Sequence, residues 1–469
     1  AVSGLMVVTE YPLALHTAAI FVFMLFRAEK KTAAAWFFVA AAPFAAGLMV
    51  YNHAAFGEWF TLGYFHESWS PFAGEIEKGF AGVTYPTPAS LYKILFLPGR
   101  GIFFLSPFLL FAIPGLVYGL RDHAARGAVA CAAAVVAATV LVNASYFLPG
   151  GGMAAGPRHL VPCIPYMVFL CIFFLKKTGP AGRGVFAGLA AVSALLHLAV
   201  TATDPQPPQV FDFPSAGYSL ELLLSGVSRP SWLSLLAGGG PSWPLAAFAA
   251  FPAAALALAM RRLPRTAGDP PRASSMHHGL LSAALLSAVL FVAIVAVCQH
   301  IYSRQEPGAK RYHLAKTYRL LGHTDLAQKE YLAALDHDRT IAPAYFGLAQ
   351  IHASRGNARA ALENFLQAAE YNPGFAEAHY NIASLAHAGG NPGLALRHYK
   401  KFMETERHGD RRRLARAQAG IAVILFERGN YAAARDELGK ARQLAPADRA
   451  VERAGTLIEG GEDYEGQNP

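Results

Sequence analysis

Runs of about 15 to 21 apolar residues recur along the chain as far as Gln299 and then stop. Because an α-helix rises about 1.5 Å per residue, a run of about 20 apolar residues spans the hydrocarbon core of a bilayer, which is roughly 30 Å thick. The hydrophobic content of 54% over 469 residues is high for a soluble chain. The pattern predicts an all-α protein in which residues 1–300 form a polytopic membrane domain.

Eight runs have the length of a membrane span. The first lies close to Ala1, in an apolar stretch that lacks the basic flank and cleavage site of a signal peptide, so we expect further helices upstream. The eight predicted spans cover approximately residues 10–26, 33–51, 101–120, 127–147, 159–176, 184–202, 242–260 and 279–299.

Lysine and arginine are concentrated in four of the loops between these spans. They are Arg27, Lys30 and Lys31; Arg121 and Arg126; Lys176, Lys177 and Arg183; and Arg261, Arg262, Arg265 and Arg272. The four loops alternate along the chain and so share one face, which the excess of positive charge predicts to be cytoplasmic. The external face then carries the segments 52–100, 148–158 and 203–241, together with everything after Gln299.

The net charge and the cysteines argue against two classes of site. Much of the net charge of +9 lies in the short loops, where it sets orientation, so it does not predict nucleic-acid binding. Cys131, Cys163, Cys171 and Cys298 all lie within apolar runs, which leaves the loops without a cysteine for a disulfide or a zinc site. We therefore expect no metal cofactor.

A period of 34 residues begins near Gly308. Gly322, Gly356 and Gly390 are each 34 residues apart, and Gly429 follows after an insertion of five residues near 406–410. Small and large apolar residues recur at fixed places in each unit: Ala327, Ala361, Ala395 and Ala434; Leu314, Leu348, Ile382 and Ile421; and Tyr331, Phe365 and Tyr399. Residues 308–450 resemble the tetratricopeptide repeat (TPR) family, with about four repeats. The polar tail, residues 460–469, is expected to be disordered.

The TPR resemblance implies an α-solenoid, because a single helical hairpin cannot bury its apolar face alone. The groove of such an array is expected to bind a protein or peptide. Polar residues of the first helices could contact that ligand or could simply be solvated; they include His313, Gln350, His352, Asn381 and Gln418.

Two arginines begin predicted spans on the external face. Arg100 stands in PGRGIFFLSP, and Arg158, followed by His159, stands in GGGMAAGPRHLVP. A guanidinium and the free amides of a helix start both suit phosphate oxygens, and the glycines before Arg158 let the backbone approach a ligand closely. Ligand binding and anchoring at the lipid headgroups both stay open for each arginine.

Further polar residues lie at the external ends of the first two spans. Glu10 lies at the end of the first span, and Tyr64, His66 and Glu67 follow the second. Ionisable groups at membrane depth are costly and are therefore functional candidates. All four are therefore candidate site residues. Solvation in a loop and an aromatic belt at the headgroups are the alternative explanations.

Three segments resemble a known family. YNHAAFGEWFTLGY (51–64), GRGIFFLSP (99–107) and GGGMAAGPRHLVP (150–162) are similar to membrane glycosyltransferases of the GT-C fold, in particular to bacterial relatives of dolichyl-phosphate-mannose protein mannosyltransferases. The resemblance covers about residues 1–200. It implies a protein of the bacterial inner membrane that transfers a sugar from a polyprenyl-phosphate carrier to an acceptor on the periplasmic side.

The resemblance also implies roles for individual residues. Arg100 and Arg158 match arginines that would face the carrier phosphate, and Glu10, His159 and Tyr64 would line the cavity. His66 and Glu67 could orient an acceptor. The general base would be an acidic residue of the first external loop, which we expect upstream of Ala1. Two alternatives remain: an oligosaccharide ligase or polymerase, and a non-catalytic TPR scaffold anchored in the membrane.

Overall fold

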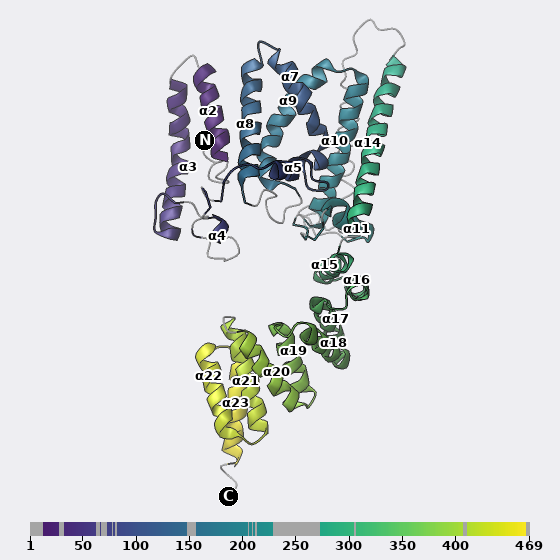
Figure 1. Ribbon diagram of the computed structural model, residues 1–469. Helices are drawn as coiled ribbons and strands as arrows, with labels where there is room; N and C mark the ends of the chain where they lie inside the picture. Colours follow the sequence, from purple (N-terminus) through teal and green to yellow (C-terminus); the bar gives the residue numbers. More distant parts are fainter. Residues whose placement is uncertain are drawn as a thin grey trace. The chain divides into compact units, whose positions relative to one another are not determined.

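The computed structural model describes residues 13–27, 32–61, 66, 73–76, 78–79, 82–147, 156–204, 206–208, 210–211, 213–227, 273–303, 306–406 and 410–465. The chain divides into two compact units, Ala1–Gln305 and Glu306–Pro469. Both units are helical (Figure 1), and across the described ranges β-type pairing is limited to one antiparallel bridge between Val83 and Tyr146. The all-α prediction is confirmed.

The first unit consists mainly of apolar helices. They are α2 (Ala14–Arg27), α3 (Thr32–Phe56), α4 (Ala73–Ile76), α5 (Pro88–Phe96), α6 (Ile102–Leu105), the 3-10 helix η3 (Pro107–Phe111), α7 (Ala112–Leu120), α8 (Arg126–Ser145), the 3-10 helix η4 (Arg158–Cys163), α9 (Ile164–Lys177), α10 (Pro180–Thr203), the π-helix η5 (Ser215–Ser219), α11 (Leu220–Leu224) and α14 (Ala273–Ser303). The predicted span 242–260 lies outside the described residues, and each of the other seven predicted spans corresponds to helices of this set.

Five helical stretches of this unit are long and apolar enough to cross a membrane: Ala35–Phe56, Arg126–Ser145, Arg158–Lys177, Pro180–Thr203 and Gly279–Cys298. Their outer faces keep large apolar side chains exposed, such as Trp36 and Phe38 on α3 and Leu286 and Val289 on α14. Exposed apolar surface of this extent is what a bilayer covers. The chain is a membrane protein.

The predicted span over 101–120 is formed by three consecutive helical segments and not by one continuous helix. Helix α6 ends at Leu105, Ser106 leaves the helical region with φ −135° and ψ 65°, and η3 and α7 follow. Pro107 explains the break, because its ring disfavours the helical conformation in the preceding residue and it has no N–H to donate. The side chain of Ser106 lies 3.0 Å from Nε2 of His197 on α10, so the broken turn is tied to a neighbouring helix.

Helices α10 and α14 lie side by side and run in the same direction (Figure 1). A Cβ on Gly184 would overlap the carbonyl oxygen of Leu280, and one on Gly188 would overlap that of Ala284. The contacts advance by four residues on both helices in the same order, which fixes the parallel direction.

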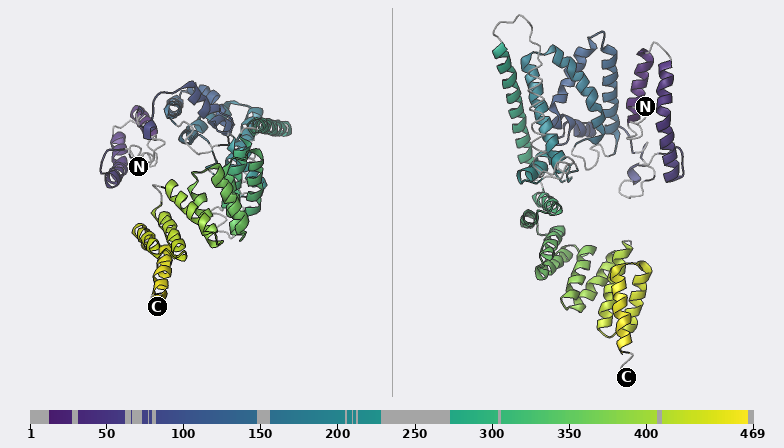
Figure 2. Two further views of the ribbon diagram at one scale, coloured as in Figure 1. Left: turned by 60° about the horizontal axis from the view of Figure 1, so that its bottom comes forward. Right: turned by 180° about the vertical axis from the view of Figure 1, so that it is seen from behind.

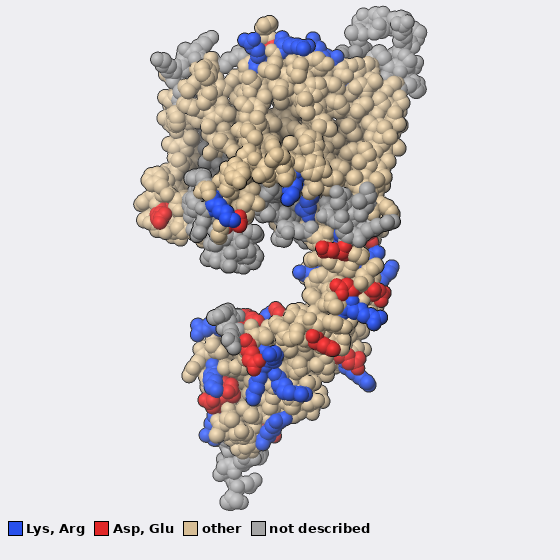
Figure 3. Space-filling view, viewed as in Figure 1, with Lys and Arg blue, Asp and Glu red and all other residues tan. Residues whose placement is uncertain are grey.

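Basic side chains mark one end of this unit. Arg121, Arg126, Lys176, Lys177 and Arg183 lie where α7 meets α8 and where α9 meets α10, and Figure 3 shows lysines and arginines gathered at that end. The starts of α6 and η4 lie at the opposite end, since α7 and α9 each run from there to a basic loop. Because α10 begins at the basic end and α14 runs parallel to it, α14 ends at the Arg100 and Arg158 end.

The second unit is a row of helical hairpins, and Figure 2 shows them stacked one after another in green to yellow. The hairpins pair α15 (Pro307–Leu320) with α16 (Thr324–His337), α17 (Ala342–Ser354) with α18 (Ala358–Tyr371), α19 (Ala376–Ala388) with α20 (Pro392–Thr405), and α21 (Arg411–Glu427) with α22 (Tyr431–Leu444). The predicted small residues Ala327, Ala361, Ala395 and Ala434 are fully buried. The four predicted repeats correspond to these four helical hairpins.

Glycine and asparagine shape the turn inside each hairpin. Gly322, Gly356, Gly390 and Gly429 all have φ between 74° and 85°, a conformation that suits glycine because it has no Cβ. In the last three hairpins the side chain of the following asparagine accepts a hydrogen bond from the start of the second helix; these residues are Asn357, Asn391 and Asn430. The 34-residue period is therefore a period of turn geometry as well as of packing.

A final helix, α23 (Arg449–Glu465), follows the fourth hairpin. Helix α23 continues to Glu465, so the prediction of disorder from Gly460 is wrong for residues 460–465. The helix is held to the array at its start, where Val451, Ala454 and Ile458 bury the apolar surface that α21 and α22 would otherwise expose. The Arg442 guanidinium also donates to Glu459 at 2.7 Å. Helix α23 therefore closes the array, as terminal repeats must.

The close approach of α10 and α14 depends on glycine at position 188. We expect Gly188→Val to destabilise the membrane unit by about 1–3 kcal/mol, because the new side chain has to displace the Ala284 carbonyl. Thermal unfolding of the detergent-solubilised protein measures the loss. Gly47→Val is the matched control, since no atom lies within 4 Å of a Cβ at this position of α3; equal losses in the two variants would contradict the proposed packing.

Two histidines of the TPR unit form a close pair. Nδ1 of His379 lies 3.0 Å from Nδ1 of His398, and Nε2 of His379 lies 2.9 Å from the Pro373 carbonyl oxygen. A carbonyl only accepts, so His379 carries its proton on Nε2 and His398 donates its Nδ1–H to His379. Burial, together with the neighbouring His379 and Arg397, lowers the pKa of His398 to about 4.

The lowered pKa predicts that acid destabilises the TPR unit. Between about pH 6.5 and pH 4 an unfolded histidine binds a proton that His398 refuses in the folded state, so the free energy of unfolding falls as pH drops through this window. Urea denaturation of residues 306–469 at pH 7.5, about 5.5 and about 4.5 measures it. His398→Gln should flatten the dependence, and the same change at exposed His337 should not; matching pH slopes in both variants would refute the role of His398.

Candidate functional site

Arg158 and His159 line a polar pocket at the start of η4. The pocket has a volume of about 260 Å³ and is bounded by α2, α8 and η4; its lining residues are Leu13, His16, Thr139, Arg158, His159, Val161 and Pro162. Arg158 is the first residue of η4 and its side chain is exposed, whereas the His159 ring is half-buried and stands edge-on to Tyr146 at 5.7 Å. Two of the predicted site residues, which are adjacent in the sequence, thus line one pocket.

Sequence reasoning missed the histidine on the wall of this pocket. His16 on α2 is 1% exposed, and its Nε2 lies 2.7 Å from the Thr139 hydroxyl on α8. The same hydroxyl donates to the Val135 carbonyl at 2.7 Å. The Tyr166 ring stands edge-on to His16 at 5.5 Å. The available signal was a lone histidine within an otherwise apolar run, a position where a polar side chain needs a reason.

Arg100 does not line this pocket. Its Nη2 donates to the Phe211 carbonyl at 3.1 Å, so the guanidinium is directed towards the segment after α10. The two arginine segments nevertheless pack together, because a Cβ on Gly156 would meet the Leu105 side chain and approach the Arg100 carbonyl. Arg100 and Arg158 therefore lie at the same end of the unit on adjoining backbone.

A buried acid accompanies the Arg100 contact. Asp204, at the end of α10, is 9% exposed and accepts a hydrogen bond from the Tyr218 hydroxyl at 3.3 Å. The Tyr218 ring packs on Phe211 at 4.9 Å, and the Phe211 carbonyl is the acceptor for Arg100. Asp204 and Tyr218 therefore hold in place the segment that carries the partner of Arg100.

The candidates near the end of α3 divide between described and undescribed positions. Nε2 of His66 lies 2.9 Å from the Thr61 hydroxyl, and its ring stacks on Phe56 at 4.3 Å. A second stack joins His53 and Trp59 at 4.2 Å. His66 thus belongs to a local aromatic cluster, whereas Glu10, Tyr64 and Glu67 lie outside the described residues.

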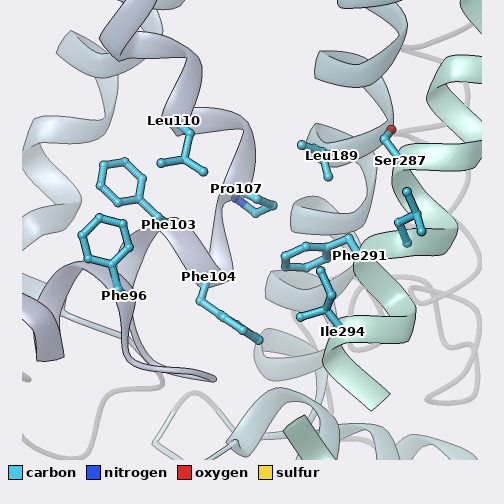
Figure 4. A pocket seen from close by; sticks show the side chains of 10 residues that line it. Phe96, Phe103, Phe104, Pro107, Leu110, Leu189, Ser287, Phe291 and Ile294 are labelled. Carbon is cyan, nitrogen blue, oxygen red and sulfur yellow. The ribbon is translucent and has the colours of Figure 1, made fainter. Parts of the chain in front are cut away.

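An apolar pocket of about 450 Å³ lies between the broken third span and the α10–α14 pair (Figure 4). Its lining is Phe96, Phe103, Phe104, Pro107, Leu110, Leu189, Ser287, Leu290, Phe291 and Ile294. Figure 4 shows Phe96 and Phe103 on one side and Leu189, Phe291 and Ile294 on the other. Helix α6 lies beside the apolar pocket, which Phe103 and Phe104 line, and its Leu105 packs against Gly156, two residues before Arg158.

The first helices of the repeats carry fewer free polar groups than predicted. Gln418 is buried, with its Oε1 lacking a partner among the residues that the structure describes. Asn381 donates to the Glu377 carbonyl of its own helix at 2.7 Å. Burial and nearby Lys316 lower the pKa of His313. Gln350 and His352, both half-buried, keep the predicted capacity for ligand contact.

In the described part of the chain, no three histidine, cysteine, aspartate or glutamate side chains lie together in a group that could hold a metal ion.

Comparisons with known proteins concern the repeats. A family model described as tetratricopeptide repeat matches residues 342–375, the second hairpin. A comparison with curated proteins gives no match.

Several solved structures are similar over the repeats. MamA is 19% identical over 39% of this chain and 96% of its own, with a TM-score of 0.28. YrrB, described as a TPR protein with an unusual peptide-binding site, is 18% identical over 37% and 87%, with a TM-score of 0.29. A TPR protein from Parabacteroides merdae is 20% identical over 38% and 68%, with a TM-score of 0.30. The TPR assignment rests on the family match and on the repeat geometry, and these repeats make the second unit a protein-interaction module.

Proposed function

We propose that the protein is a membrane glycosyltransferase that moves a sugar from a polyprenyl-phosphate carrier to an acceptor on the external side. One observation carries this proposal: the exposed side chain of Arg158 lines the polar pocket, in a unit that consists mainly of apolar helices. A cation at such a pocket suits an anionic group that reaches it from the membrane. The carrier phosphate is such a group.

The chemistry of Arg158 fits a departing phosphate. A guanidinium donates paired hydrogen bonds to phosphate oxygens, and the amides at the start of η4 add positive potential. In sugar transfer the phosphate gains charge as the glycosidic bond breaks, so a fixed cation stabilises the transition state more than the ground state. Arg158 binds the phosphate and stabilises the leaving group.

The apolar pocket supports a lipid carrier. Nine of its ten lining side chains are hydrocarbon, aromatic or proline, with Ser287 as the exception. An isoprenoid chain is entirely apolar and gains free energy from such a lining, at roughly 25 cal/mol for each Å² buried. Since α6 lines the apolar pocket and also packs beside the segment that carries Arg158, one carrier could place its tail in the apolar pocket and its phosphate at Arg158.

The TPR unit would then recruit the acceptor or a partner protein. The chain leaves α14 at the end of the membrane unit that holds Arg158, and the repeats begin directly afterwards. This order supports repeats that share a compartment with the pocket. The TPR family match also favours a second candidate, a membrane-anchored scaffold without transfer activity.

Arg158→Ala should lower the rate of sugar transfer by about 10²–10³-fold, the usual cost of removing a charge-stabilising donor. Arg158→Lys should recover part of the loss, because it restores the charge without the fork geometry. Transfer of radiolabelled hexose from a polyprenyl-phosphate hexose, in membranes containing the full protein, is the measurement. Arg121→Ala, at the basic end, is the control. Unchanged transfer in Arg158→Ala would remove the proposed phosphate role, and no transfer by the unaltered protein would favour the scaffold.

The proposed arrangement predicts opposite locations for two loops. Alkaline phosphatase fused after Thr178, in the basic loop between α9 and α10, should be inactive because that loop is cytoplasmic. The same enzyme fused after Ser303 should be active. The measurement is phosphatase activity in bacterial cells, normalised to the abundance of each fusion. An inactive fusion at Ser303 would mean that the repeats lie on the opposite side of the membrane from the proposed site.

A further inference from the structure

The hydrogen-bond role of each His16 nitrogen follows from its partner. Thr139 has one hydroxyl proton, which it donates to the Val135 carbonyl at 2.7 Å. Its oxygen therefore accepts from His16, so Nε2 of His16 carries the proton and donates across 2.7 Å. The neutral ring then has its lone pair on Nδ1. Thr139 thus orients His16 as a hydrogen-bond acceptor.

No hydrogen-bond donor is paired with Nδ1 of His16 in the described part of the chain. Nδ1 of His16 is buried and lacks a hydrogen-bond partner among the described residues, although His16 itself lines the polar pocket. Leaving a buried acceptor unpaired costs about 1–3 kcal/mol. Because native proteins pair nearly all such groups, an orphan on the wall of a cavity indicates a donor that arrives with a ligand.

The other polar groups of the pocket restrict what that ligand is. Arg158 supplies a positive charge and His16 supplies a neutral acceptor. A phosphodiester alone satisfies Arg158 but has no O–H for Nδ1. The volume of about 260 Å³ lies just below the roughly 300–1,000 Å³ of whole-ligand sites, so it suits a head group only. An anion that carries a hydroxylated head group satisfies both residues.

We propose that Nδ1 of His16 accepts a hydrogen bond from one hydroxyl of the hexose on the bound lipid phosphate, and that His16 thereby selects the sugar. The proposal rests on the function proposed above and adds the residue that distinguishes the glycosylated from the bare carrier. A site with a buried acceptor discriminates strongly against a ligand without the matching hydroxyl, because that ligand leaves the acceptor unpaired. His16 is a specificity-determining residue in this account, and Thr139 positions it.

The test compares two probes, decyl phosphate and the phosphodiester of decanol with a hexose, by calorimetric titration of the whole detergent-solubilised protein at about pH 8.5, where decyl phosphate has lost its second proton and carries no O–H. The unaltered protein should bind the hexose probe at least tenfold more tightly. His16→Phe keeps a ring against Tyr166 but has no acceptor, so it should abolish this preference and leave decyl phosphate binding unchanged. His16→Asn offers a carbonyl oxygen near the Nδ1 position and should keep a preference of several-fold.

Thr139→Val tests the orientation of the ring. Without the Thr139 oxygen, Nε2 loses its acceptor and the tautomer with its proton on Nδ1 becomes available. The preference for the hexose probe should then fall about three- to tenfold, while decyl phosphate binding stays the same. An undiminished preference in this variant would overturn the orienting role.

Hexose probes that each lack one hydroxyl keep the test independent of how the variants fold. In the unaltered protein one deoxy position should reproduce the full loss seen in His16→Phe, and in that variant the same deletion should have no further effect. If every deoxy probe binds like the parent, His16 contacts no sugar hydroxyl and the inference is wrong.

Arg158→Ala separates this inference from the proposed function. It should weaken both probes by at least tenfold. A variant that weakens neither probe refutes the phosphate site itself, whereas a weakened Arg158→Ala beside an unchanged His16→Phe refutes only the selection of the sugar.

Discussion

In the hydrocarbon core of a bilayer no water is present to satisfy a polar group, so each backbone N–H and C=O has to find its partner within the protein. This constraint makes the first unit helical, and it gives meaning to the places where the helical pattern fails. The break at Ser106 is one such place, and it is tied to His197. The same constraint applies to side chains: the buried Nδ1 of His16 on α2 has no hydrogen-bond partner among the described residues, and His16 lines the pocket that holds Arg158.

The parallel packing of α14, the last helix of the membrane unit, against α10 depends on two glycines of α10, which have no side chain. Gly184 and Gly188 let α10 approach the carbonyls of Leu280 and Ala284 in parallel register. Close approach of this kind is a common way for helices to associate where the surrounding lipid offers no hydrophobic driving force. It also determines at which end of the unit the chain leaves the membrane domain, and hence which compartment the repeats would share.

The repeats follow a different physical rule. Each hairpin contacts mainly its neighbours, so the buried alanines and the left-handed glycines recur at one spacing, and stability accumulates from one unit to the next. Such an array tolerates the insertion between Thr405 and Arg411, because only one interface has to adjust. Helix α23 ends the row by burying the last apolar face.

Elements with local signals could be predicted from the sequence alone. Apolar run length located the spans, and the spacing of Gly322, Gly356, Gly390 and Gly429 located the repeats, because helix length and turn geometry depend on neighbouring residues. Chain order also placed Arg100 and Arg158 at one end.

Which side chains meet could be learned only from the folded chain. His16 and Thr139 are 123 residues apart, and Arg100 and Phe211 are 111 apart. The sequence suggested that both arginines would face one phosphate, yet the folded chain directs Arg100 to a backbone carbonyl and brings a histidine towards Arg158 instead. Contacts of this kind depend on how helices pack across the unit, and no local periodicity records that packing.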